Sequence, residues 1–166
     1  MFSQFFKKAL RGFTLIEVLI VIGIIAILAA IVIVAINPAK QFAQARNTQR
    51  EAGVNALLNA IGQNMADNKG VFTCVGGDPL PAVGVTATTS KADLDIRPCL
   101  VPVYISELPQ DPSAPANTCT DAACTSPGTY DTQFNITVNS TGRVTVCAPN
   151  GAESSIPNSK NICVTR

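Results

Sequence analysis

The side chains that could carry chemistry are few in this chain of 166 residues, and they are unevenly distributed. The chain has no histidine, which excludes Ser-His-Asp and Cys-His catalysis and removes the commonest metal ligand. Its six cysteines all lie in the last 93 residues, and one carboxylate, Glu17, lies inside a 24-residue apolar stretch, 13–36. Because no nucleophile can be paired with a base, we predict that the protein is not an enzyme and uses no cofactor or metal.

The cysteines indicate an oxidising compartment. Their number is even, and the region around them is rich in Asn, Thr, Ser, Gly and Pro, so its core is thin and disulfides would stabilise it. Reduced buried thiols are the alternative, and zinc is disfavoured because there is neither a CxxC pair nor a histidine. The disulfide candidates are Cys74, Cys99, Cys119, Cys124, Cys147 and Cys163.

The N-terminal segment differs from an ordinary secretory signal. Lys7, Lys8 and Arg11 precede the apolar stretch, but this stretch is long enough to span a bilayer of about 30 Å, and no Ala-x-Ala cleavage site follows it. We therefore expect a single-pass anchor in the cytoplasmic membrane. Basic residues flank both ends, so the positive-inside rule does not orient it. The disulfides need an extracytoplasmic C-terminal domain, which leaves the N-terminus in the cytoplasm.

A short motif joins the basic segment to the apolar one. From Arg11 to Ile20 the chain reads Arg-Gly-Phe-Thr-Leu-Ile-Glu-Val-Leu-Ile, which resembles the cleavage motif of type IV prepilins and type II secretion pseudopilins. The resemblance implies that a dedicated prepilin peptidase cuts between Gly12 and Phe13, removes the basic leader 1–12 and methylates the new amine of Phe13. A plain signal-anchor with a chance Gly-Phe pair is the alternative.

Glu17 is the most informative single residue. A carboxylate within an apolar span costs on the order of 3 kcal/mol unless it is paired. Glu17 lies four residues past Phe13, about one helical turn. The resemblance implies that it meets the cationic Phe13 amine of a neighbouring subunit, so that assembly removes the penalty and the charge sets the register. Alternatively, Glu17 reaches the cytoplasmic interface without a partner.

Two helical patterns follow each other along the chain. The stretch 13–36 is apolar all round, as in a helix buried in lipid or in a filament core. Over 37–69 one apolar stripe opposes a face of Gln, Asn, Arg and Lys, which predicts an amphipathic half packed on a globular domain. We predict a near-continuous helix over 13–69, about 85 Å long, which Pro38 kinks or locally loosens and Gly70 caps. The buried stripe should contain Phe42, Ala45, Ala52, Val54, Leu57, Leu58, Ile61 and Met65.

The remaining region, 70–166, is predicted to form a disulfide-rich antiparallel sheet. The clearest hairpin joins 133–138 to 143–147 through a turn at 139–142, and 161–165 can add a last strand. Three or four strands packed on the apolar stripe would form the whole core. The fold class is therefore α+β, with the layout of the pilin fold that the resemblance implies.

Spacing favours one disulfide pattern among the fifteen that six cysteines allow. Two cysteines enclose a four-residue loop, two would join the hairpin to the last strand, and two are left for each other. The pattern is Cys119–Cys124, Cys147–Cys163 and Cys74–Cys99.

Acidic residues in the loops raise the question of calcium. The stretch 104–112 resembles the Leu-Pro-x-Asp-Pro connection of major pseudopilins, which can carry a calcium site nearby. Asp111, Asp121 and Asp131 could supply oxygens, but they form no spaced acidic motif. We therefore predict solvated loop carboxylates and no metal.

These features predict a structural subunit that polymerises with identical or related pilin subunits into a cell-surface or envelope filament. The resemblance implies prepilin peptidase, membrane lipid and an assembly platform as further partners. Without the leader the chain keeps nine basic and eleven acidic side chains, which argues against dedicated nucleic-acid binding. The alternative is a monomeric, membrane-anchored module that captures a ligand or DNA. The sequence does not distinguish a pilus from a secretion or competence pseudopilus, or a major subunit from a minor one.

Overall fold

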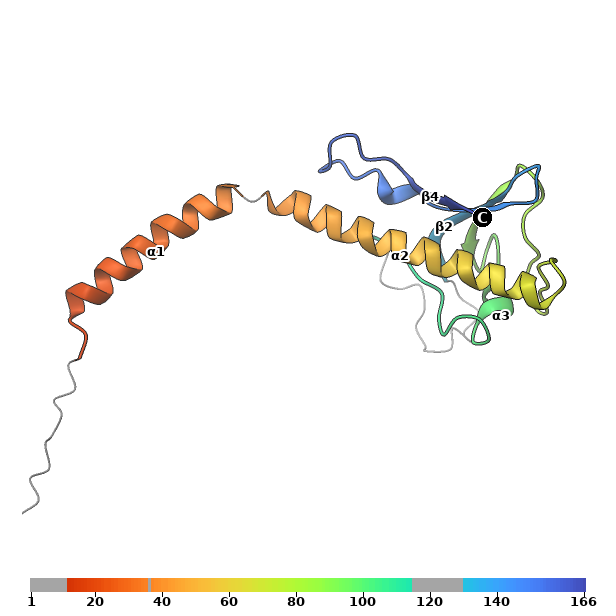
Figure 1. Cartoon of the computed structure of the whole chain (residues 1–166), viewed down its shortest axis with the longest axis horizontal. Helices are drawn as coiled ribbons and strands as arrows, with labels where there is room; N and C mark the ends of the chain where they lie inside the picture. Colours follow the sequence, from red (N-terminus) through yellow and green to blue (C-terminus); the bar gives the residue numbers. More distant parts are fainter. Residues whose placement is uncertain (1–11, 36, 115–129) are drawn as a thin grey trace, which may run out of the picture. The chain divides into compact units, whose positions relative to one another are not determined.

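The computed structural model describes residues 12–35, 37–114 and 130–166 (Figure 1). Within it the chain divides into two compact units, one that ends at Pro38 and one that spans Ala39–Arg166. The first unit contains helix α1, and the second contains a long helix, α2, with a four-stranded sheet.

Helix α1, Leu15–Ala35, consists almost entirely of bulky apolar residues. Every large apolar side chain from Phe13 to Ile33 is at least half exposed, so the helix buries no face against the described part of its own chain. Since such a surface is unfavourable in water, lipid or other protein molecules must cover it.

The helix is interrupted just before Pro38, which agrees with the prediction that this proline kinks or locally loosens a near-continuous helix over 13–69. α1 ends at Ala35, Asn37 is not helical, and α2 spans Pro38–Asp67. A proline at the first helical position loses only an N–H that has no intrahelical partner, and it disfavours a helical conformation in the residue before it. Both effects make Pro38 the start of a second helix.

The end of α2 was predicted correctly. Lys69 and Gly70 adopt positive φ angles of 59° and 89°, the left-handed conformation that terminates a helix. The Gly70 N–H donates to the carbonyl of Met65 at 2.7 Å, which satisfies one of the last free carbonyls.

The sheet is antiparallel throughout, in the order β1-β2-β3-β4. The predicted hairpin is confirmed: β2 pairs with β3, and Ile136 lies opposite Val146. The predicted last strand is confirmed as β4 on the far side of β3. The first strand, β1, was not predicted. The four strands are β1 (Thr86–Ser90), β2 (Asp131–Val138), β3 (Val144–Ala148) and β4 (Ile162–Thr165).

One core lies between α2 and the sheet, which run side by side in Figure 1. Phe134, Ile136 and Val146 are fully buried because strand alternation points them toward the helix. Helix α2 contributes a buried row from its second half, and the short helix α3, Arg97–Leu100, closes the core with Leu100. The buried row of α2 is Val54, Leu57, Leu58, Ala60 and Ile61.

The first half of the predicted apolar stripe was wrong. Phe42 is 67% exposed, and Ala45 and Ala52 are exposed as well. Apolar packing on the sheet begins only at Gly53, where an added Cβ would lie 3.0 Å from the ring of Phe134. Before that point the helix buries a charged residue, Arg50, which the sequence had placed on the solvated face.

Among the described residues two disulfides join parts of the second unit, and both pairs were proposed from the sequence. Cys147 and Cys163 lie opposite each other on β3 and β4 and are bonded. The other disulfide ties the loop after α2 to α3 and joins Cys74 to Cys99. The third proposed pair, Cys119–Cys124, lies outside the described residues. The α+β class with an antiparallel, disulfide-stapled sheet is confirmed.

Candidate functional site

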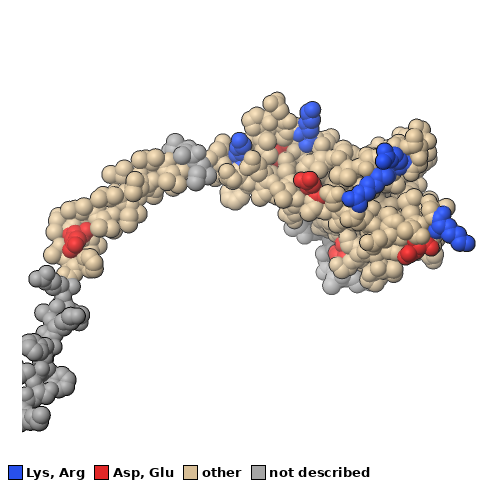
Figure 2. All heavy atoms as spheres, in the orientation of Figure 1, with Lys and Arg blue, Asp and Glu red and all other residues tan. Residues whose placement is uncertain are grey.

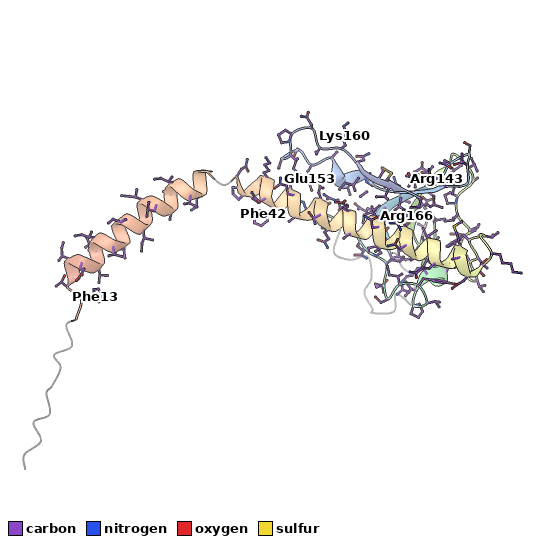
Figure 3. The ribbon with its side chains drawn as sticks, viewed as in Figure 1. Phe13, Phe42, Arg143, Glu153, Lys160 and Arg166 are labelled. Carbon is purple, nitrogen blue, oxygen red and sulfur yellow. A yellow bond between two sulfur atoms is a disulfide. The ribbon has the colours of Figure 1, made fainter. Side chains whose placement is uncertain are left out.

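The peptide between Gly12 and Phe13 directly precedes α1, and Phe13 is labelled at that end of the helix in Figure 3. Both residues are exposed, and 82% of Phe13 is accessible. A Cβ added at Gly12 would meet no atom within 4 Å. Because the fold itself does not require glycine here, a need for glycine would come from a molecule that acts on this peptide.

Thr14 starts the helix, a role that was missed in the sequence. Its hydroxyl accepts the backbone N–H of Glu17 at 3.3 Å, and its carbonyl accepts the N–H of Val18 at 3.2 Å. This is the geometry of an N-cap, in which a side chain satisfies one of the free N–H groups of the first turn. The signal was present, since Thr-x-x-Glu before an apolar run is the capping-box pattern.

The carboxylate of Glu17 is exposed on an otherwise apolar helix surface, which appears in Figure 2 as one red patch on tan α1. Among the described residues, no hydrogen bond or ion pair involves this carboxylate. Its position in the first turn lets the helix dipole stabilise it by about 0.3–1 kcal/mol. That is well below the penalty of about 3 kcal/mol for a charge in an apolar span, so a further partner is needed.

The helix that carries Glu17 is long and apolar enough to cross a membrane. Residues Leu15–Ile33 form a helix of 19 residues, and by length and composition it can cross a bilayer. None of this segment is buried within the described chain. The described part of the chain thus contains an anchor-like helix with one charged group near its N-terminal end.

The loop carboxylates form no metal site within the described residues. The prediction that Asp111 is solvated was wrong, because it is 3% exposed and bound to Arg50. Burial raises the pKa of Asp111, but hydrogen bonds from Arg50 and Ser113 outweigh it and leave the pKa below its ordinary value. Asp131 is half-buried and accepts the N–H of Gln133 at 2.8 Å, and Asp121 lies outside the described residues.

A hollow of about 440 Å³ lies between the second half of α2 and the β2–β3 turn. Its floor is apolar, with Leu58, Ile61 and Val144, and its charged side chain is Arg166. It contains no acid, thiol or hydroxyl that a base could activate. The hollow therefore offers no catalytic arrangement.

The described residues thus combine a capped, apolar helix, in which the carboxylate of Glu17 has no described partner, with a disulfide-stapled domain. Comparison with known proteins agrees: residues 7–33 match the prokaryotic N-terminal methylation motif. The chain is also 36% identical over 85 residues to a fimbrial protein of Dichelobacter nodosus, an overlap of 51% of this chain and 49% of that protein. The chain thus spans about half the length of this relative. No solved structure matches it.

The predicted resemblance to type IV pilins is therefore confirmed. The motif match covers the segment that carries Gly12, Phe13 and Glu17.

Proposed function

We propose that this chain is a structural, non-catalytic subunit of a type IV pilus-like or pseudopilus filament. Prepilin peptidase cuts it after Gly12 and methylates Phe13, and the mature chain polymerises through α1. Before assembly, α1 anchors the subunit in the cytoplasmic membrane, with the disulfide-stapled domain on the extracytoplasmic side. The anchored subunit is then delivered to an assembly platform. In the filament, α1 helices of identical or related subunits replace lipid.

One observation supports this proposal most strongly: Glu17 has no partner in the described part of its own chain and lies one turn from the cleavage position. An α-amine has an ordinary pKa of about 7.7–8.0, so the amine of Phe13 is largely cationic at neutral pH, and a methylated amine stays cationic. Within the described part of one copy, no hydrogen bond or ion pair satisfies the Glu17 carboxylate. A neighbouring copy can bring the two charges together in an apolar, weakly screened environment.

The decisive experiment substitutes Glu17→Gln in a strain that carries the assembly machinery. This change keeps the size and apolar surroundings of the side chain but removes its charge. We expect membrane insertion to be retained and the amount of subunit in sheared filaments to fall by at least tenfold. The matched control is Glu51→Gln, the same change at an exposed position of α2, which should leave filament yield unchanged.

Mass spectrometry of the same strains reports on cleavage separately. The mature wild-type chain should begin at Phe13 and carry one additional methyl group. If Glu17→Gln assembles normally, the pairing of Glu17 with a neighbour is wrong. If neither the wild type nor the variant appears in sheared filaments, a monomeric anchored module is favoured. If the leader 1–12 is still attached in the mature protein, the proposed processing is wrong.

A further inference from the structure

The first turns of α2 are held to their domain in an unusual way. From Pro38 to Gln49 the buried apolar side chain is that of Ala43, while Phe42 is 67% exposed. The apolar core of α2 starts at Val54. A helix segment of this length that buries so little apolar surface should fray, unless other contacts hold it.

Polar contacts to the β3–β4 connection supply this hold. We call residues 149–161 the arm; Glu153 and Lys160 are labelled on it in Figure 3, where it runs beside the first half of α2. Arg46 donates to both carboxylate oxygens of Glu153 at 2.7 and 2.8 Å. The Asn47 amide donates to the carbonyl of Gly151 at 3.0 Å.

Arg50 connects the arm to a third segment. Its Nε and Nη2 donate to the two carboxylate oxygens of Asp111 at 2.7 and 3.1 Å. Its Nη1 donates to Glu153 at 2.6 Å and to Asn47 at 2.8 Å, and Nη2 also donates to Ser113 at 2.7 Å. These contacts use all five donors of a guanidinium, which is what a buried arginine needs to avoid an unpaired N–H.

The charges in this cluster balance, with two arginines facing two carboxylates. The Arg50 and Asp111 side chains are 1% and 0% exposed, whereas Glu153 is 13% exposed and lines a hollow that is open to solvent. Hydrogen bonds from Arg46 and then from Arg50 lower the pKa of Glu153 to about 2. The cluster therefore stays ionised and closed at neutral pH.

We propose that Arg46, Asn47, Arg50, Asp111 and Glu153 form a polar latch that fixes the first turns of α2 to the domain. While it is closed, the latch prevents fraying of these turns; when it opens, α2 unwinds from Pro38 toward Gly53 and stops where apolar packing begins. The latch does not depend on polymerisation. Its use, to keep a pull along the chain from peeling α2 off the sheet, rests on the proposed function.

The test is amide hydrogen exchange, read by mass spectrometry on the full-length chain in detergent micelles. In Glu153→Gln the latch loses its charge-assisted bonds to Arg46 and Arg50, so exchange in peptides covering 39–50 should rise on the order of tenfold or more. Peptides covering 54–66 should keep the wild-type rate. The control Glu51→Gln removes a charge from the same helix, on its exposed face, and should change neither region.

A milder variant keeps the proposal testable if Glu153→Gln folds poorly. Arg46→Gln removes a half-exposed partner and leaves Arg50 bound to Glu153, so it should give a smaller rise over 39–50. Unchanged exchange over 39–50 in both variants would overturn the latch. An equal rise over 54–66 would also overturn it, because the contacts would then stabilise the whole domain. Filament yield is measured separately, so a failed assembly proposal leaves this result standing.

Discussion

Glu17 in the first unit and Asp111 in the second are both carboxylates, but their electrostatic environments are opposite. Glu17 is exposed and has no ion-pair partner among the described residues. Asp111 is buried and receives two hydrogen bonds from the guanidinium of Arg50. The second unit thus neutralises its buried charge with its own residues, whereas the first leaves its charge for another molecule.

The two helices differ in the same way. α1 exposes every large apolar side chain from Phe13 to Ile33, while α2 uses apolar packing from Val54 onward and the polar latch before it. The difference indicates which unit is complete as a folded domain and which needs a partner. A subunit that is to polymerise needs both kinds of unit.

Breaking the charge balance between Arg50 and Asp111 should have the largest effect on the free energy of unfolding of the second unit. Arg50→Met leaves Asp111 buried without its partner, so we expect the domain to lose about 3–5 kcal/mol of unfolding free energy. Urea unfolding followed by near-ultraviolet circular dichroism of the tyrosines measures this loss, since the chain has no tryptophan. Glu17→Gln in the same assay should change the value by less than about 0.5 kcal/mol. Equal effects of the two substitutions would remove the contrast between the units.

Acid should weaken the second unit in a defined pH range. The folded-state pKa of Glu153 is lowered to about 2, and that of Asp111 is lowered as well. A lowered pKa stabilises the fold above the unfolded-state value, which is about 4, and this stabilisation is lost as the pH falls toward about 2. The urea midpoint should therefore drop over this range, and less steeply in Glu153→Gln. A midpoint that is flat down to pH 2 would contradict the role of the latch.

The smallest loss of stability is expected from removing the Thr14 cap at the start of α1. Thr14→Ala removes the hydroxyl that accepts the Glu17 N–H, which should destabilise the first turn by about 1 kcal/mol. Faster amide exchange at Glu17 in micelles, measured by nuclear magnetic resonance, would report this loss. Thr48→Ala is the control, because Thr48 lies inside α2 and bonds to the Gln44 carbonyl rather than capping a helix end. Equal changes in both variants would argue against the cap.

Local patterns were enough to predict some parts of the molecule. The alternation of Phe134, Ile136 and Val138 fixed the face and register of the central hairpin, since strand geometry has a period of two. The N-terminal motif could be recognised because the spacing along one chain segment is itself the signal, and residues 7–33 match the methylation motif. In both cases the relevant contacts are close in sequence.

Other parts depend on contacts between distant residues, which no local pattern contains. Strand β1 reads Thr-Ala-Thr-Thr-Ser, and it is a strand because β2 offers it an edge. Arg50 is buried by partners 61 and 103 residues away. Phe42 fits the apolar period, but it is 67% exposed while its neighbour Ala43 is buried, so the domain covers a different face of α2 at this point. Periodicity shows which face could be buried and leaves open whether anything covers it.

The Cys147–Cys163 disulfide has a consequence for how the latch behaves in time. Glu153 lies six residues after one bonded cysteine and ten before the other, so both ends of its segment are tethered to adjacent strands. When thermal motion separates Glu153 from its arginines, the carboxylate cannot diffuse far, and its effective concentration near them stays high. Each opening is therefore brief and reversible, and the arm returns to the same two arginines.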